Sequence, residues 1–95
     1  MPGFHMVGQL AAKAAEALDD RDADDAVRSA EAAVQLAPQN AGYRQLLGRA
    51  YVLAGRFASA ETALSDALAL GSSDARTIVS LALVQVALLQ LAVTF

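Results

Sequence analysis

The sequence predicts a small all-α domain built from antiparallel helix hairpins. Alanine, the residue with the highest helix propensity, supplies 23 of the 95 positions. Hydrophobic residues make up 56% of the chain and charged residues 18%, which is too apolar a balance for a disordered segment. Apolar residues recur with a helical period in segments roughly 13 residues long, and short polar breaks separate these segments. Helices joined by such short loops pack side by side in antiparallel pairs.

The composition also excludes several classes of function. The chain has no cysteine, which excludes a disulfide framework, a thiolate nucleophile and a cysteine-ligated zinc site. Its net charge of −3 argues against a nucleic-acid partner. The single histidine, His5, lies in an irregular start, and the sequence contains no phosphate-binding or dinucleotide-binding loop. We therefore expect a protein that is not an enzyme and that uses no cofactor.

The first helix is expected over residues 7–18. The preceding residues 1–6 show no helical periodicity and contain Pro2 and Gly3, which favours an irregular terminus or a vector remnant. No cationic stretch followed by an apolar core marks a signal peptide, so a cytoplasmic location is favoured. The apolar stripe of this helix consists of Leu10, Ala14, Ala17 and Leu18.

The second helix is expected over about residues 24–36. Asp24 or Asp25 is a suitable N-cap, and Pro38 ends the helix. Its predicted buried side consists of Ala26, Val27, Ala30, Ala33, Val34 and Leu36.

Three more helices follow at similar spacing. The third covers about 41–54 and stops at Gly55, a residue type favoured just past a helix end. The fourth covers 57–70 and stops at the segment that begins with Gly71. The fifth begins at Ala75, with Asp74 as its N-cap.

The chain repeats itself at an offset of 34 residues without a gap. This offset pairs Ala26 with Ala60, Ala33 with Ala67, Leu36 with Leu70 and Leu47 with Leu81. Residues 41–74 resemble a tetratricopeptide repeat (TPR), a helix-turn-helix unit of this length. Leu47 and Gly48 match its Leu-Gly pair, Tyr51 its aromatic position, and Ala60 and Ala67 its small positions. Leu64 stands where an aromatic residue is commoner, and Ser72 replaces the usual proline.

The resemblance implies a short right-handed TPR-type superhelix, an α-solenoid, of about two and a half units. Residues 7–40 form a degenerate unit, residues 41–74 a full unit, and residues 75–95 an apolar helix in the place of a third unit's first helix. It also implies a scaffold or module that binds another protein or a peptide.

In this family the first helix of each unit supplies most of the concave surface. The corresponding positions in the first unit are Gly8, Ala11, Ala15 and Leu18. The predicted partner-binding groove consists of Gln45, Arg49, Val52, Arg76, Val79, Leu83 and Val86. Alanines at 11 and 15 replace the lysine and asparagine of members that clamp a peptide carboxylate, so this function is disfavoured. The groove is mostly apolar, with Gln45, Arg49 and Arg76 as polar handles, and suits an apolar helix or extended peptide. The alternative is that its small residues pack against a neighbouring helix.

The acidic run over residues 19–25 is the densest charge in the chain. Asp20, Asp22, Asp24 and Glu31 have the spacing of a calcium loop. However, Asp25 occupies the position that needs glycine, and Glu31 falls on a helix in the repeat register. We therefore expect a solvated loop that caps a helix, and no metal site.

Residues 78–95 are uncharged and apolar nearly all round the expected helix. Leu89 stands where the repeat register expects a turn glycine, so one continuous helix from Ala75 is expected. Such a surface needs burial, and we expect a homo-oligomer in which Leu81 faces its own repeat. The predicted self-association residues are Leu83, Val86, Leu88, Leu91 and Phe95. The alternatives are a tail-anchored membrane adaptor with 78–95 as anchor, and a fragment of a longer repeat protein.

Overall fold

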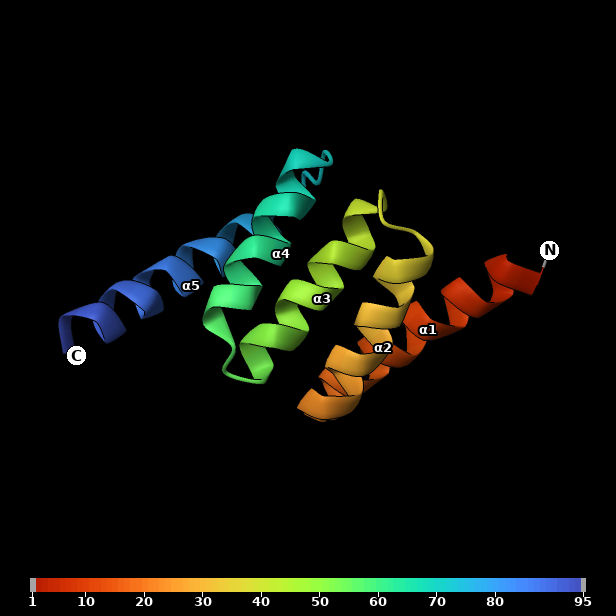
Figure 1. The fold of residues 1–95 in the computed structure, drawn as a ribbon, viewed down its shortest axis with the longest axis horizontal. Coiled ribbons are helices and arrows are strands. Elements are labelled where there is room, and N and C mark those ends of the chain that lie inside the picture. The colour runs from red at the N-terminus through yellow and green to blue at the C-terminus, as the bar shows by residue number, and fades with distance from the viewer. Residues whose placement is uncertain (1, 95) are drawn as a thin grey trace.

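The computed structural model describes residues 2–94 and is all-α in that part of the chain (Figure 1). Its helices are α1 (Pro2–Asp19), α2 (Ala23–Leu36), α3 (Ala41–Leu53), α4 (Phe57–Ala69) and α5 (Ala75–Thr94). They follow one another along an elongated molecule of 49 × 27 × 19 Å, with the two ends of the chain at opposite ends (Figure 1). This confirms the predicted stack of helix hairpins.

The start of α1 differs from the prediction. The helix begins at Pro2 rather than at Val7, so the expectation of an irregular segment is wrong for residues 2–6. Met1 lies outside the described residues. A proline is tolerated at the first position of a helix because the N–H groups of the first turn have no partner within the helix.

The N-cap of α2 also lies earlier than expected. Its cap is Asp22, whose carboxylate accepts a hydrogen bond from the backbone N–H of Asp25 at 3.1 Å. Asp24 and Asp25, the predicted caps, lie inside the first turn instead. There their charges still favour the helix dipole.

Three helices end in the same hydrogen-bonded turn. In each turn a backbone N–H donates to the carbonyl oxygen five residues earlier. The three bonds are Asp22 to Ala17 (2.8 Å), Arg56 to Tyr51 (2.9 Å) and Ser72 to Ala67 (3.0 Å). Each turn contains one residue with positive φ: Arg21 at 61°, Gly55 at 76° and Gly71 at 100°. Glycine is the residue usually found there, because a side chain in this conformation costs roughly 1–2 kcal/mol. Arg21 occupies the position that Gly55 holds one repeat later.

The core is built mainly from small residues. Ala14, Ala26, Ala30, Ala50 and Ala60 are fully buried, as are Ala33 and Ala67. One predicted core residue is exposed: Leu36, the last residue of α2, has 51% of its surface accessible. It is rotated by about 60° from Ala33 and therefore lies at the edge of the buried stripe.

α3 and α4 approach each other closely at Gly48. A Cβ atom on Gly48 would lie 2.5 Å from Cγ and Cδ2 of Leu64, which is itself fully buried. No side chain larger than hydrogen fits there unless Leu64 moves, and its packed surroundings resist that movement. Gly48 is therefore required by the helix crossing.

Replacing Gly48 with alanine should destabilise the fold by about 1–3 kcal/mol through overpacking. The matched control is Gly8→Ala on α1, where an added Cβ meets nothing within 4 Å. That change should instead stabilise the helix by about 0.5–1 kcal/mol. Urea denaturation measures both values.

The clash predicts a specific coupling as well. The double variant Gly48→Ala/Leu64→Ala should lose less stability than the sum of the two single variants, because removing Cγ and Cδ2 of Leu64 removes the obstruction. Additive losses would show that the crossing does not depend on this contact.

Candidate interaction surfaces

One side of α5 packs on the rest of the domain. Thr77 is fully buried and Val84 is 2% exposed, and Leu81 and Leu88 are half-buried against the core. The spacing of these residues is that of one helical stripe. The expectation that Leu81 faces its own repeat is confirmed, and Leu88 lies on the same side.

The remaining surface of α5 is apolar and exposed. Seven of the nine exposed large hydrophobic residues in the described part of the chain lie on this helix. They are Ile78, Val79, Leu83, Val86, Leu89, Leu91 and Val93, and we call them the α5 face. Three predicted self-association residues belong to it, with Leu83 at 65%, Val86 at 53% and Leu91 at 44% exposed. Phe95 lies outside the described residues.

The repeat register relates the exposed side of α5 to the side of α3 that packs against α4. Ala82 aligns with Gly48 and Gln85 with Tyr51, and α3 buries both Gly48 and Tyr51. On α5, Ala82 and Gln85 are exposed. On α3 this side is covered by α4. On α5 no helix covers the corresponding side within the residues that the structure describes.

The length and composition of α5 also fit a membrane span. The helix has 20 residues and contains an 18-residue window with a mean hydropathy of 2.0, and only 11% of that window is buried. At about 1.5 Å per residue it is roughly 30 Å long, the thickness of a hydrocarbon core.

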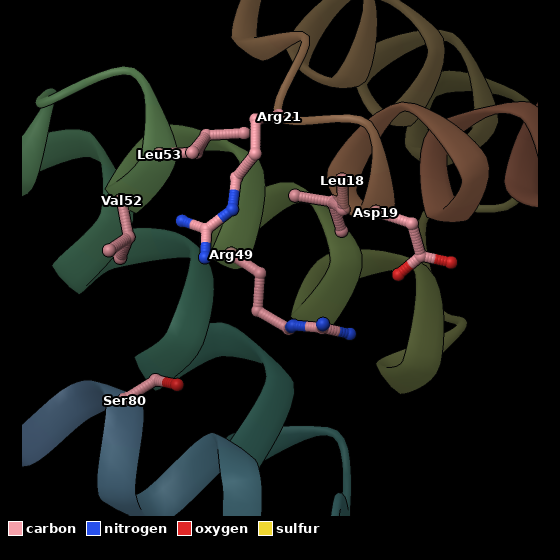
Figure 2. A pocket seen from close by; sticks show the side chains of 7 residues that line it. All are labelled: Leu18, Asp19, Arg21, Arg49, Val52, Leu53 and Ser80. Atoms are coloured by element: carbon pink, nitrogen blue, oxygen red, sulfur yellow. The ribbon is translucent and has the colours of Figure 1, made fainter.

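A pocket of about 430 Å³ opens where the end of α1 faces α3 and α5 (Figure 2). It brings together three predicted concave-surface residues, which are Leu18, Arg49 and Val52. Its other lining residues are Asp19, Arg21, Leu53 and Ser80. Arg21 belongs to the turn after α1, so a search limited to first-helix positions could not find it.

Other predicted groove residues lie elsewhere. Val79, Leu83 and Val86 do not line this pocket and are more than half exposed on α5. Gln45 is only 8% exposed, so the expectation of an accessible polar handle is wrong for it. Its Nε2 atom has no hydrogen-bond partner within the described part of the chain.

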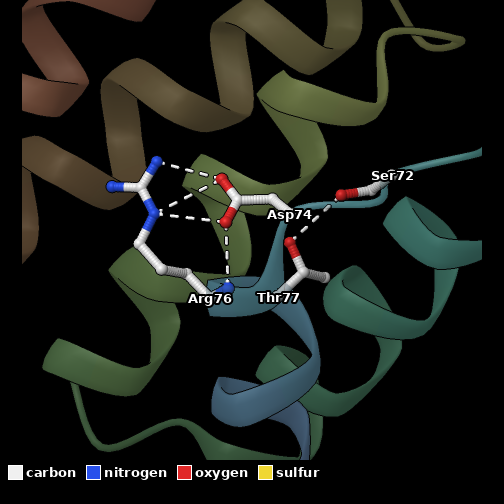
Figure 3. Close-up of polar contacts among 4 residues, drawn as sticks. All are labelled: Ser72, Asp74, Arg76 and Thr77. Carbon is white, nitrogen blue, oxygen red and sulfur yellow. Dashed lines mark hydrogen bonds and ion pairs between the residues drawn. The ribbon is translucent and has the colours of Figure 1, made fainter.

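Arg76 is exposed but already paired. Its guanidinium donates to the Asp74 carboxylate at 2.9 Å, and its backbone N–H donates to the same carboxylate at 2.9 Å (Figure 3). These two hydrogen bonds from Arg76 lower the pKa of Asp74 to about 2. The hydroxyls of Ser72 and Thr77 lie 3.2 Å apart beside this pair (Figure 3). Asp74 and Arg76 therefore fix the first turn of α5, as the predicted cap requires.

The acidic residues make helix caps and ion pairs. Asp25 lies 3.6 Å from the Lys13 ammonium and 4.0 Å from the Arg28 guanidinium. Glu31 accepts a hydrogen bond from the Tyr51 hydroxyl at 2.8 Å. Burial, together with this carboxylate, raises the pKa of Tyr51. Glu31 is thus held by α3 and does not turn back toward the acidic loop.

A family model described as the tetratricopeptide repeat matches residues 17–84, which is more than half of the chain. No curated protein matches the chain.

The Asp74–Arg76 pair predicts a shift that can be measured directly. Arg76→Gln removes the main cause of the lowered pKa, so the pKa of Asp74 should rise from about 2 toward 3.8. Carboxyl ¹³C chemical shifts followed against pH measure it, and Arg28→Gln on α2 is the control that should leave Asp74 unchanged.

The sign of the pH dependence follows from the same shift. A carboxyl whose pKa is lower in the folded state stabilises the fold above pH 3.8, and this contribution is lost as the pH falls through about 2. The difference in Tm between the wild type and Arg76→Gln should shrink over that interval. A constant difference would contradict the pair's role.

Proposed function

Because the chain belongs to the tetratricopeptide repeat family, we propose that this protein-interaction module self-associates through the α5 face. The observation that carries the proposal is the concentration of exposed large apolar residues on α5. Soluble monomers rarely expose a contiguous apolar patch of this kind, and such patches mark contact surfaces.

The size of the α5 face suits a second copy of the chain. Its seven large side chains offer roughly 700 Å² of apolar surface, close to the ~800 Å² per partner of a standard interface. A two-fold axis lets one patch cover the same patch on the other copy.

Charge favours the same occupant. The α5 face carries no charged residue, whereas the chain as a whole has a net charge of −3. Pairing α5 with α5 therefore keeps the repelling charges of the two copies away from the contact. The close approach of two helices is helped by Ala82, a small exposed residue in the middle of this surface.

A second candidate is a membrane adaptor anchored by α5. The observation in its favour is the length and hydropathy of the helix. Against it, entry into a bilayer would separate Thr77 and Val84 from α4 and uncover the face of α4 that they cover. The self-association proposal keeps these contacts.

The test is the double variant Leu83→Glu/Val86→Glu. Both residues are more than half exposed, so the helix should still form, but two carboxylates in an apolar contact would be too costly to desolvate. The wild type should have at least the mass of a dimer by light scattering, and the variant the mass of a monomer with unchanged circular dichroism.

The matched control is Ala58→Glu/Ala69→Glu, which adds the same charges at exposed positions of α4. It should keep the parent mass. A wild type that is already monomeric in dilute buffer would overturn the proposal. Flotation of the wild type with lipid vesicles, lost in Leu83→Glu/Val86→Glu, would support the membrane anchor instead.

A further inference from the structure

The pocket between α1, α3 and α5 contains two positive charges that have no partner in the described residues. Of the chain's seven basic residues, Lys13, Arg28, Arg44 and Arg76 each lie within 4.0 Å of a carboxylate. Arg56 lies over the Tyr51 ring, 4.7 Å from its centre. The remaining two are Arg21 and Arg49, and both line this pocket.

The two arginines come from different elements and both line the pocket. Arg21 belongs to the turn after α1, and Arg49 lies on α3 (Figure 2). Asp19 lines the pocket too, but it forms no ion pair with either arginine among the described residues. Neither guanidinium is neutralised by a carboxylate within the described residues, so an anionic partner at the pocket would gain from both charges.

The backbone at Arg21 gives independent support. Arg21 has a positive φ of 61° at a position where the turns after α3 and α4 use glycine. Glycine would satisfy this turn with less strain, so the turn itself does not explain the arginine. Strained residues of this kind are found where a side chain serves binding.

The walls of the pocket define the ligand further. Leu18, Val52 and Leu53 supply apolar surface beside the two arginines, and Ser80 adds a hydroxyl from α5. An inorganic anion would leave the apolar walls unused. A peptide that alternates acidic and apolar side chains would use both, and its charge complements the two guanidinium groups.

We infer that this pocket binds an acidic segment of a partner protein, with Arg21 and Arg49 each contacting a carboxylate side chain. The inference rests on the protein-interaction role of the family and names the chemistry of the partner. It does not require self-association.

The experiment uses a fluorescent Glu-Leu repeat peptide as the probe, with a Gln-Leu repeat peptide of equal length for comparison. The Glu-Leu peptide should bind at least about tenfold more tightly, and added salt should weaken it. Arg49→Gln should lower its affinity about tenfold, whereas Arg28→Gln, which removes an exposed arginine from α2, should not.

The most informative variant is Arg21→Gly. It should raise the Tm, because glycine suits the turn, and should also weaken the Glu-Leu peptide about tenfold. A purely structural residue would not move stability and affinity in opposite directions. A lower Tm or an unchanged affinity would overturn the role of Arg21.

The remaining outcomes also decide the inference. Equal binding of the two peptides, or no binding of either, would overturn the acidic pocket. Competition by inorganic phosphate at the same concentration as the peptide would identify a simple anion site and overturn the peptide assignment. Light-scattering mass measured on the same samples reports self-association separately, so either proposal can fail without the other.

Discussion

The close approach of α3 to α4 at Gly48 is the constraint on which the rest of the structure depends. With Leu64 directly above Gly48, the two helices can pack only where small residues line the crossing, and fully buried Ala60 and Ala67 continue this condition along α4. A core made of alanine packs helices tightly but buries little apolar area per residue. Most of the large apolar side chains that remain exposed in the described residues lie on α5.

The repeat register relates the interaction surfaces to the fold. An offset of 34 residues places Arg21 on Gly55 and Ala82 on Gly48. Arg21 stands where the equivalent turn has glycine, the residue that this turn prefers. Ala82 keeps the small size of Gly48, although no helix covers it among the described residues. In a repeated backbone, a single difference in sequence thus places an arginine of one turn at the edge of a pocket.

The two surfaces differ in their physical chemistry. The α5 face is uncharged, so contacts on it depend on removing apolar area from water and change little with salt. The binding that we infer at the pocket of Arg21 and Arg49 would depend on charge and would weaken as salt screens it. Ser80 is on α5 and lines the pocket, so the two surfaces lie side by side on that helix.

Local sequence determined the helices, their breaks and the repeat register, because helix propensity, apolar period and turn residues act over a few positions. The continuous helix from Ala75 followed from the absence of a turn glycine at Leu89, and the inward side of Leu81 followed from the register. Tertiary structure alone decided that Gln45 is buried, that Glu31 is paired with Tyr51 and that Arg21 joins Arg49 at one pocket. Whether a polar side chain is covered, paired or free depends on which other segments pack beside it. That information resides in the distances between helices and not in the spacing of residues along one of them.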